Sequence, residues 1–201
     1  MVMNNKLKIS NSLDLSISEE KISKKKAIEL FELDLLGNLE PGKYETLSFI
    51  HKHLFSEIYD FAGNIRDVNI SKDNFSFAPY MYLNITLKNI DKMPQKSFEE
   101  IIEKYVEMNV AHPFREGNGR ATRIWLDHML KHSIHRVINW SNIDKNNYLL
   151  AMKISPVSDI EIKNLLKSAL SDKVNDKEVF YKGIDNSFLY EGFNKFKCEQ
   201  L

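Results

Sequence analysis

Apolar residues recur every three or four positions along most of the chain, the spacing typical of α-helices. This pattern predicts helices from Lys43 to Phe61, from Tyr80 to about Ile90, and from Ser16, which begins a capping-box pattern, to a stop at Gly37. A further helix, from about Gly119 to His132, carries apolar residues almost all around it. We therefore expect that helix to be buried at the centre of the fold.

A serine followed three residues later by Glu or Asp marks the start of three more helices. The three serines are Ser97, Ser141 and Ser158. The helix that begins after Ser97 should end near Ala111, because Pro113 disfavours helical geometry in the residue before it. Two last helices are predicted, over residues 176–182 and 186–197, with Gly183 between them.

The period changes to two between Ile65 and Ala78, where apolar and polar residues alternate on both sides of a Lys72-Asp73-Asn74 turn. This alternation predicts a short β-hairpin. A lone hairpin is marginally stable in water, so it must pack on the helices or be completed by a strand from a partner. The predicted fold class is mainly α with one short β-hairpin, and 201 residues fit a single domain.

Composition excludes several classes of function. Lys plus Arg and Asp plus Glu both number 28, so no net charge draws the whole molecule to nucleic acid or to a membrane surface. The one cysteine, Cys198, excludes an intramolecular disulfide framework and a cysteine-rich zinc site. No apolar run approaches the ~20 residues of a membrane span, and the first residues lack a signal-peptide pattern. We expect a cytoplasmic protein that binds neither nucleic acid nor membrane directly.

The chain has only seven glycines, and two of them, Gly117 and Gly119, flank Asn118. Both can adopt positive φ, so consecutive backbone N–H groups can converge into a nest for an anion. The next helix adds its positive N-terminal end, which makes phosphate the natural ligand. Arg120 and Arg123 lie three apart on one face of that helix, where they could grip further phosphate oxygens.

Two more residues complete a candidate site. Glu116 would repel phosphate directly, so its useful role is to hold a Mg²⁺ ion that bridges phosphate oxygens. His112 ends one helix and faces the start of the next, where it can take a proton from an attacking hydroxyl. A base, a metal ligand and an anion cradle thus fall within nine positions.

Each of these features also has a purely structural interpretation. The two glycines suit a plain turn, His112 can simply end a helix, and Arg123 with Asp127 can form a surface salt bridge. The coincidence of several active-site roles in a glycine-poor chain favours chemistry. The motifs of P-loop enzymes, dinucleotide-binding folds and protein kinases do not occur in the sequence.

The string from His112 to Arg123 resembles the signature of the Fic family, H-x-F-x-[D/E]-G-N-G-R-x-x-R, at every fixed position. The resemblance extends over about residues 40–170. Residues 53–55 and 60–66 look like the segment before the family's flap, 72–77 like the flap, and 148–152 like a helix that lines the adenine pocket. The resemblance implies a single Fic-like domain over residues 1–201, built as a helical bundle with a hairpin flap beside the active site.

Proteins of this family typically transfer AMP from ATP to a Tyr, Ser or Thr hydroxyl of a target protein. By resemblance, His112 would be the base and Glu116 would hold Mg²⁺. The implied ATP-binding residues are Lys72, Asn109, Gly117, Asn118, Gly119, Arg120, Arg123, Asn147 and Tyr148. The flap would dock a target segment by strand addition, through Asn69, Ile70, Ser71, Lys72 and Phe75.

Ser187 to Gly192 resembles the motif [S/T]-x-x-x-E-[G/N] of Fic proteins with a C-terminal inhibitory helix, here expected at about 186–197. By that resemblance Glu191 would pair with Arg123 and keep the γ-phosphate of ATP out of its productive place. Related proteins suggest a DNA topoisomerase such as gyrase as the target, and a homo-oligomer is compatible with this subclass. Two alternatives stay open: a nucleotide-binding module without transfer, and transfer of a different phosphate-containing group.

Two other clusters are interpreted as surface features. Three histidines share one helical face but lack the H-E-x-x-H pattern, so a solvated face is favoured over a metal site; they are His128, His132 and His135. A run of lysines is likewise expected to be solvated; it consists of Lys24, Lys25 and Lys26.

Overall fold

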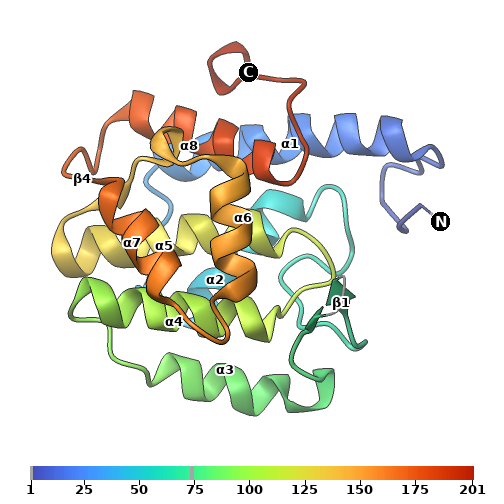
Figure 1. The fold of residues 1–201 in the computed structure, drawn as a ribbon. Coiled ribbons are helices and arrows are strands. Elements are labelled where there is room, and N and C mark those ends of the chain that lie inside the picture. The colour runs from blue at the N-terminus through green and yellow to red at the C-terminus, as the bar shows by residue number, and fades with distance from the viewer. Residues whose placement is uncertain (1, 73–74) are drawn as a thin grey trace.

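A computed structural model of the protein describes residues 2–72 and 75–201, and the fold is mainly helical, as predicted (Figure 1). The α-helices of this part of the chain are α1 (Ser12–Glu32), α2 (Tyr44–Phe55), α3 (Leu83–Asp91), α4 (Phe98–Ala111), α5 (Asn118–Ile134), α6 (Lys145–Ile154), α7 (Ile160–Ser168) and α8 (Lys177–Tyr190). Short 3₁₀ turns lie at Tyr80–Tyr82, Trp140–Asn142 and Cys198–Gln200. None of the helices in the described residues combines the length and apolarity that crossing a membrane requires.

The helix α5 lies among the other helices, as its apolar residues predict (Figure 1). It packs against α2, α4 and α8, and its Ala121, Trp125 and Leu126 are fully buried. Trp125 Nε1 donates to the carbonyl of Lys43, which precedes α2 (3.0 Å). Because α5 is enclosed, its first turn has a fixed place relative to α4 and α8.

The helix α4 begins and ends where the sequence predicts. Ser97 Oγ accepts from the backbone N–H of Glu100 (3.3 Å), and the Glu100 carboxylate accepts from the Ser97 N–H (3.2 Å). These reciprocal bonds are the capping box. The helix ends at Ala111, ahead of Pro113.

The start and end predicted for the first helix are wrong. It begins at Ser12 rather than Ser16, because the side chain of Asn11 accepts from the first free backbone N–H groups and caps the helix there. It ends at Glu32, before the predicted stop at Gly37. Apolar spacing continues beyond both ends, so it could not locate them.

Three other predicted boundaries also moved. The helix α2 ends at Phe55 rather than Phe61. Asp144 itself caps α6 by accepting from the Asn147 N–H (2.9 Å), so no capping box starts at Ser141. The helix α7 begins at Ile160, directly after Asp159, so no capping box starts at Ser158 either. Where several short polar residues stand together, spacing alone does not tell which one is the cap.

The last two predicted helices are one helix, because α8 runs without a break from Lys177 to Tyr190. Gly183 does not divide it. A Cβ at Gly183 would lie 3.3 Å from Trp140 Cδ1, so the glycine lets α8 pack closely on that ring. The chain turns away at Gly192, whose φ is 92°. The helix predicted at 186–197 is therefore wrong in both its start and its end.

The predicted hairpin is present as strands β1 (Ser71–Lys72) and β2 (Phe75–Ser76), which pair antiparallel with Ser71 opposite Ser76. The predicted turn residues Asp73 and Asn74 lie outside the described residues. Just after β2, the Ala78 N–H donates to the carbonyl of Val110 in the last turn of α4 (3.0 Å). The hairpin is thus bound to the C-terminal end of α4. Such packing is expected, because an isolated hairpin is only marginally stable in water.

A second antiparallel pair, β3 (Val137–Ile138) with β4 (Leu170–Ser171), was not predicted. Strands of two residues are too short to give an alternating pattern. The pair joins the segment that follows α5 to the segment that follows α7, so it closes the helices α6 and α7 into a loop on the bundle.

Lys24 is fully buried, so the expectation of a solvated lysine run is wrong for this residue. Its side chain is 1% exposed, and Nζ lies 3.1 Å from Glu20 Oε1 and 2.9 Å from Asp185 Oδ1 of α8. The Glu20 carboxylate also accepts from the backbone N–H of Lys195 (3.0 Å), beyond α8. This buried cluster fastens α1 to α8 and to the C-terminal segment, and the two helices lie side by side in Figure 1.

His128 is also buried, at 5% exposure, and its Nε2 is 3.1 Å from the carbonyl oxygen of Leu36. The expected solvated histidine face is therefore wrong for His128, whereas His132 and His135 are exposed. Within residues 2–72 and 75–201, no three His, Cys, Asp or Glu side chains gather into a group that could hold a metal ion.

Replacing Lys24 with Ala should lower the free energy of unfolding by about 3–5 kcal/mol, because Glu20 and Asp185 would be left as buried carboxylates without their cation. Urea denaturation followed by circular dichroism measures this loss. The matched control is Lys25→Ala at the next, exposed position of α1, which should change the unfolding free energy by less than about 0.5 kcal/mol. Equal effects of the two substitutions would contradict a buried ion pair.

Candidate active site

The segment between α4 and α5 makes two left-handed backbone turns. His112, directly after α4, has φ 49° and ψ 62°, a conformation that is uncommon for residues other than glycine. Gly117, directly before α5, has φ 76°, and a Cβ there would lie 2.5 Å from the ring of Phe55. Glycine is therefore required at 117 by both backbone and packing. The two turns bring His112 and the N-terminal end of α5 to one loop, residues 112–117.

Asn118 closes this loop from the inside. Its Oδ1 accepts from the Phe114 N–H (2.9 Å), and its Nδ2 donates to the Phe114 carbonyl (2.7 Å). The resemblance implies phosphate binding by Asn118, but its buried side chain is committed to the loop. What remains for an anion is the free backbone N–H groups at the start of α5.

The ring of His112 lies against the hairpin. It stacks on Phe77 with centroids 3.7 Å apart and planes inclined by 18°. Burial lowers the pKa of His112 to about 4, with the positive charge of Arg66 acting in the same direction and the carbonyl of Asn109 and the charge of Glu191 opposing. The imidazole is therefore neutral near pH 7, the form in which a ring nitrogen can accept a proton.

Arg120 is enclosed by protein. Its side chain has no exposed surface, and Nη1 lies 2.7 Å from Glu19 Oε1 of α1. The guanidinium carbon is 4.8 Å from the ring centroid of Phe55 and 4.6 Å from that of Phe193. Nη2 also lies 3.3 Å from Glu116 Oε1. Arg120 thus connects α1 to the loop. Its guanidinium is enclosed in this arrangement, so the expected contact of Arg120 with a phosphate stays a prediction.

Glu116 is the accessible carboxylate of the loop. Its side chain is 46% exposed, and Oε1 accepts from the backbone N–H of Gly117 (3.0 Å). Mg²⁺ is commonly held by one or two carboxylates together with the phosphates of a substrate. A single accessible carboxylate beside a helix N-terminus fits that ion.

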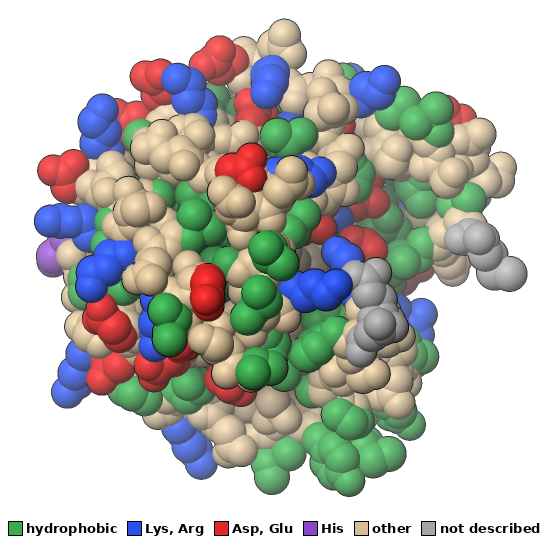
Figure 2. Space-filling model, in the orientation of Figure 1, with side chains coloured by type: hydrophobic (Ala, Val, Ile, Leu, Met, Phe, Trp, Pro, Cys, Tyr) green, Lys and Arg blue, Asp and Glu red, His purple; other side chains and the backbone are tan. Residues whose placement is uncertain are grey.

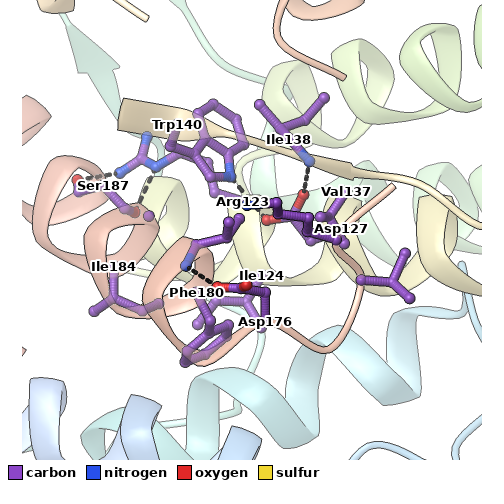
Figure 3. A pocket seen from close by; sticks show the side chains of 14 residues that line it. Arg123, Ile124, Asp127, Val137, Ile138, Trp140, Asp176, Phe180, Ile184 and Ser187 are labelled. Atoms are coloured by element: carbon purple, nitrogen blue, oxygen red, sulfur yellow. Dashed lines mark hydrogen bonds between the residues drawn. The ribbon is translucent and has the colours of Figure 1, made fainter. Parts of the chain in front are cut away.

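Arg123 joins the first turns of α5 to the end of α8 (Figure 3). Nε donates to Ser187 Oγ (2.7 Å), and Nη2 donates to the Ser187 carbonyl (2.8 Å) and to Glu191 Oε1 (2.9 Å). Burial alone would lower the pKa of Arg123, but Tyr148 and Glu191 hold it above its ordinary value. The side chain is 3% exposed, so this contact is a desolvated, charge-assisted one.

The alternative of a surface salt bridge between Arg123 and Asp127 is wrong. Asp127 accepts from the Ile138 N–H (2.8 Å) and from Trp140 Nε1 (2.7 Å), and burial raises its pKa to about 7. Figure 3 shows these groups around a pocket between α5, β3 and α8. Because Trp140 is also the ring on which Gly183 packs, α5 holds α8 both through Arg123 and through Asp127.

The carboxylate of Glu191 occupies the space over the first turn of α5. A Cβ on Gly119 would lie 2.3 Å from Glu191 Oε1. Burial would raise the pKa of Glu191, but the charges of Arg123 and Arg120 outweigh burial and lower it. The structure thus holds a carboxylate at the helix N-terminus where the sequence predicts a phosphate.

Two other predicted nucleotide-binding residues, Lys72 and Tyr148, lie near the residues described above. Lys72 is exposed on β1, and its charge acts on both His112 and Glu191. Tyr148 is buried, and its hydroxyl lies 3.4 Å from Arg123 Nη1.

Among residues 2–72 and 75–201, the side chains of Asn109 and Asn147 make no hydrogen bond that indicates a role. Asn109 is half-buried in the last turn of α4. Asn147 is exposed in the first turn of α6, and among the described residues it makes no hydrogen bond to the loop at 112–117.

The predicted docking residues of the flap lie on its stem and on both of its strands. The Asn69 side chain accepts from the Tyr80 N–H (3.0 Å), which fixes the stem. Ser71 and Lys72 are exposed, whereas Ile70 and Phe75 are half-buried. In the space-filling view, acidic and basic side chains are interspersed over the visible face, as expected for a chain of zero net charge (Figure 2).

Two residues without a predicted role support the loop. His51 Nδ1 accepts from the Gly63 N–H (2.9 Å), so its Nε2–H donates to the Glu116 carbonyl (2.8 Å). Arg66 Nε donates to the His112 carbonyl (2.8 Å). The placement of Arg66 after a glycine turn, in an arginine-poor chain, is a sequence signal that could have singled it out. His51 occupies an ordinary helical position and gives no such signal.

Known proteins are similar to this chain in the region that contains the loop at 112–117. A family model described as the Fic/DOC family matches residues 41–130, which include the hairpin, α4 and the loop. The "Probable protein adenylyltransferase Fic" of Escherichia coli K12 is 26% identical over 143 residues, covering 66% of this chain and 71% of that protein. The protein adenylyltransferase VbhT of Bartonella schoenbuchensis is 25% identical over 216 residues, covering 96% of this chain, and the chain spans only 44% of its length.

A solved structure shares the fold. The BepC protein of Bartonella tribocorum, crystallised with bound AMPPNP, superposes with a TM-score of 0.71 at 20% identity, covering 85% of this chain and 93% of that one. At that identity the likeness concerns the fold. The Fic/DOC family model is thus matched over residues 41–130, and the motif and the hairpin lie in the same part of the chain.

Proposed function

We propose that this chain is a protein adenylyltransferase, which transfers AMP from ATP to a hydroxyl side chain of a target protein. The observation that carries the proposal is the junction of α4 and α5, where His112, whose ring is neutral near pH 7, and the N-terminal end of α5 lie at the two ends of one short loop. The names of the relatives from E. coli and B. schoenbuchensis support the reaction. The AMPPNP bound to BepC supports ATP as the substrate.

In this reaction the target's hydroxyl oxygen attacks the α-phosphorus of ATP, and the bond from that phosphorus to the oxygen bridging to the β-phosphate breaks, which releases diphosphate. His112 takes the proton of the hydroxyl. The free backbone N–H groups of Asn118 and Gly119 and the positive end of α5 bind the phosphates. Catalysis then depends mainly on positioning and on neutralising charge.

Glu116 is the proposed Mg²⁺ ligand, since it is the accessible carboxylate of the loop. Glu116 would hold the ion beside the phosphates, where its positive charge would offset theirs. Arg120 orients Glu116 through its contact at 3.3 Å. Its own contact with an outer phosphate requires that Glu19 release the guanidinium, because the pair is fully enclosed.

We further propose that α8 inhibits transfer. Ser187 and Glu191 take three donor contacts of Arg123, and the Glu191 carboxylate lies over Gly119. A phosphate of ATP would have to replace that carboxylate. A hundredfold suppression corresponds to about 2.7 kcal/mol, which one buried charge-assisted pair with its packing can supply.

The hairpin is the proposed docking site for the target. Ser71 and Lys72 present an exposed strand within reach of the His112 ring, which stacks on Phe77 of the same hairpin. Strand addition would bind the target's backbone and leave its hydroxyl beside the base. A DNA topoisomerase such as gyrase is the first target to test, and a cytoplasmic location and a homo-oligomer remain predictions.

Replacing His112 with Ala should abolish transfer, since the attacking hydroxyl loses its base. The assay incubates purified gyrase subunits with ATP labelled at either the α- or the γ-phosphate. Label from the α position on protein indicates AMP transfer, γ-label indicates phosphotransfer, and no label from either supports a binding module. Transfer by His112→Ala at the wild-type rate would contradict the role of the base.

The kcat/KM of AMP transfer should depend on pH as expected for a histidine base whose pKa is lowered. Because His112 titrates at about 4 rather than 6.5, its neutral, proton-accepting form persists as pH falls from 8 to 5, and activity declines only as pH approaches 4. The kcat/KM of AMP transfer against pH, measured on Glu191→Gly, tests this. A decline centred near pH 6.5 would show an unshifted histidine.

Replacing Glu191 with Gly should raise the rate of AMP transfer at least tenfold, because Arg123 and the first turn of α5 become free for phosphate. The matched control is Glu199→Gly in the exposed C-terminal turn, which should leave the rate unchanged. Equal rates for wild type and Glu191→Gly would remove the inhibitory role of α8.

A further inference from the structure

Arg66 is a buried charged residue that stands directly before the hairpin. It is 2% exposed, and burial lowers its pKa from the ordinary arginine value. Within residues 2–72 and 75–201, no Asp or Glu forms an ion pair with it. Burying an arginine without a counter-ion is costly. The guanidinium of Arg66 therefore needs hydrogen-bond acceptors that replace the water it has lost.

The compensation comes entirely from backbone carbonyls. Nε donates to His112 (2.8 Å), Nη1 donates to Val68 (2.6 Å), and Nη2 donates to Ala111 (3.2 Å) and to Ala78. Four of the five N–H donors of the guanidinium are therefore used. A lysine could not reproduce this set, because its three donors diverge from one nitrogen instead of lying in a planar fork.

The four carbonyls belong to two structures that must be held together. Val68 and Ala78 lie on the two stems of the hairpin, before β1 and after β2. Ala111 and His112 form the end of α4 and the left-handed turn after it. The backbone N–H of Arg66 also donates to the carbonyl of Pro113, in the loop itself (2.8 Å).

The same contacts act on the imidazole. Phe77, which precedes Ala78, stacks on the His112 ring at 3.7 Å. Arg66 therefore holds the backbone of His112 on one side and, through Ala78, the aromatic ring that packs on its imidazole on the other. The left-handed φ of His112 is a conformation that persists only where surrounding contacts determine it.

We propose that Arg66 is a positioning residue for the transfer reaction: its guanidinium joins both hairpin stems to the His112 turn, so that base and docking strand move as one unit. This role rests on the proposed function, because it concerns the base and the target strand of that reaction. It adds a residue outside the loop at 112–117 to the machinery that aligns the attacking hydroxyl.

A merely structural arginine would hold the fold without changing the chemistry of His112. The charged and polar groups that act on the imidazole, in addition to its burial, are Arg66, Lys72, the Asn109 carbonyl and Glu191. Arg66 and Lys72 disfavour the imidazolium, whereas the carbonyl and the carboxylate favour it. Removing the charge of Arg66 should therefore raise the pKa of His112, and a purely structural role would leave it unchanged.

The first test uses the wild-type protein and needs no substitution. Nitrogen-15 NMR at low temperature should resolve separate Nη–H signals of Arg66 with slow rotation, because both Nη groups are hydrogen-bonded. The exposed Arg136 is the internal control and should give one averaged signal. An averaged Arg66 signal like that of Arg136 would overturn the proposal.

The second test compares Arg66→Lys and Arg66→Gln with the same changes at Arg136. Hydrogen exchange of the Phe77 and Ala78 amides should become at least tenfold faster in both Arg66 variants, while exchange in α5 stays unchanged. The NMR titration of the His112 ring should move to higher pH in Arg66→Gln. Wild-type exchange and titration in both Arg66 variants would overturn the proposal.

These readouts separate two failures. Arg66 signals, amide exchange and the His112 titration are measured without ATP or target, so they hold or fail even if the protein transfers nothing. A protein with the expected NMR results and no AMP transfer would disprove the proposed function alone. If transfer occurs, Arg66→Lys and Arg66→Gln in the Glu191→Gly form should lower kcat at least tenfold with little change in the KM for ATP.

Discussion

The guanidinium of Arg123 is the contact on which the closed structure depends. It is buried at the point where α5 meets α8, and it is shared by the hydroxyl and carbonyl of Ser187 and the carboxylate of Glu191. A buried arginine must have partners at all times. Either the end of α8 or an anionic ligand can be the partner of Arg123. Binding of an anion at the N-terminal end of α5 is therefore coupled to the detachment of Glu191.

The surroundings make this exchange local. Asp127 fixes Trp140 behind Arg123, and Lys24 fastens α8 to α1 through Asp185. These contacts hold the middle of α8, at Gly183 and Asp185, whereas Glu191 follows its last turn and has a 27% exposed side chain. The Glu191 carboxylate can therefore leave Arg123 at far lower cost than the whole helix can leave the bundle.

Sequence predicts most of what local chemistry determines. The capping box at Ser97, the hairpin and the enclosed helix α5 follow from residue spacing, and the motif brings His112, Gly117 and Arg123 to one junction. The sequence does not predict which polar side chains are buried. Lys24 and Glu19 occupy ordinary helical positions, and only their long-range partners bury them. The continuity of α8 through Gly183 likewise depends on Trp140, 43 residues away in the chain.

The competition for Arg123 is tested most directly by titration calorimetry of Mg²⁺ and ATP against three forms of the protein. The account predicts at least tenfold tighter binding by Glu191→Gly than by wild type. It predicts that this gain is lost when Arg123→Met is added to Glu191→Gly. Equal affinities for wild type and Glu191→Gly, or tight binding that persists without Arg123, would contradict it.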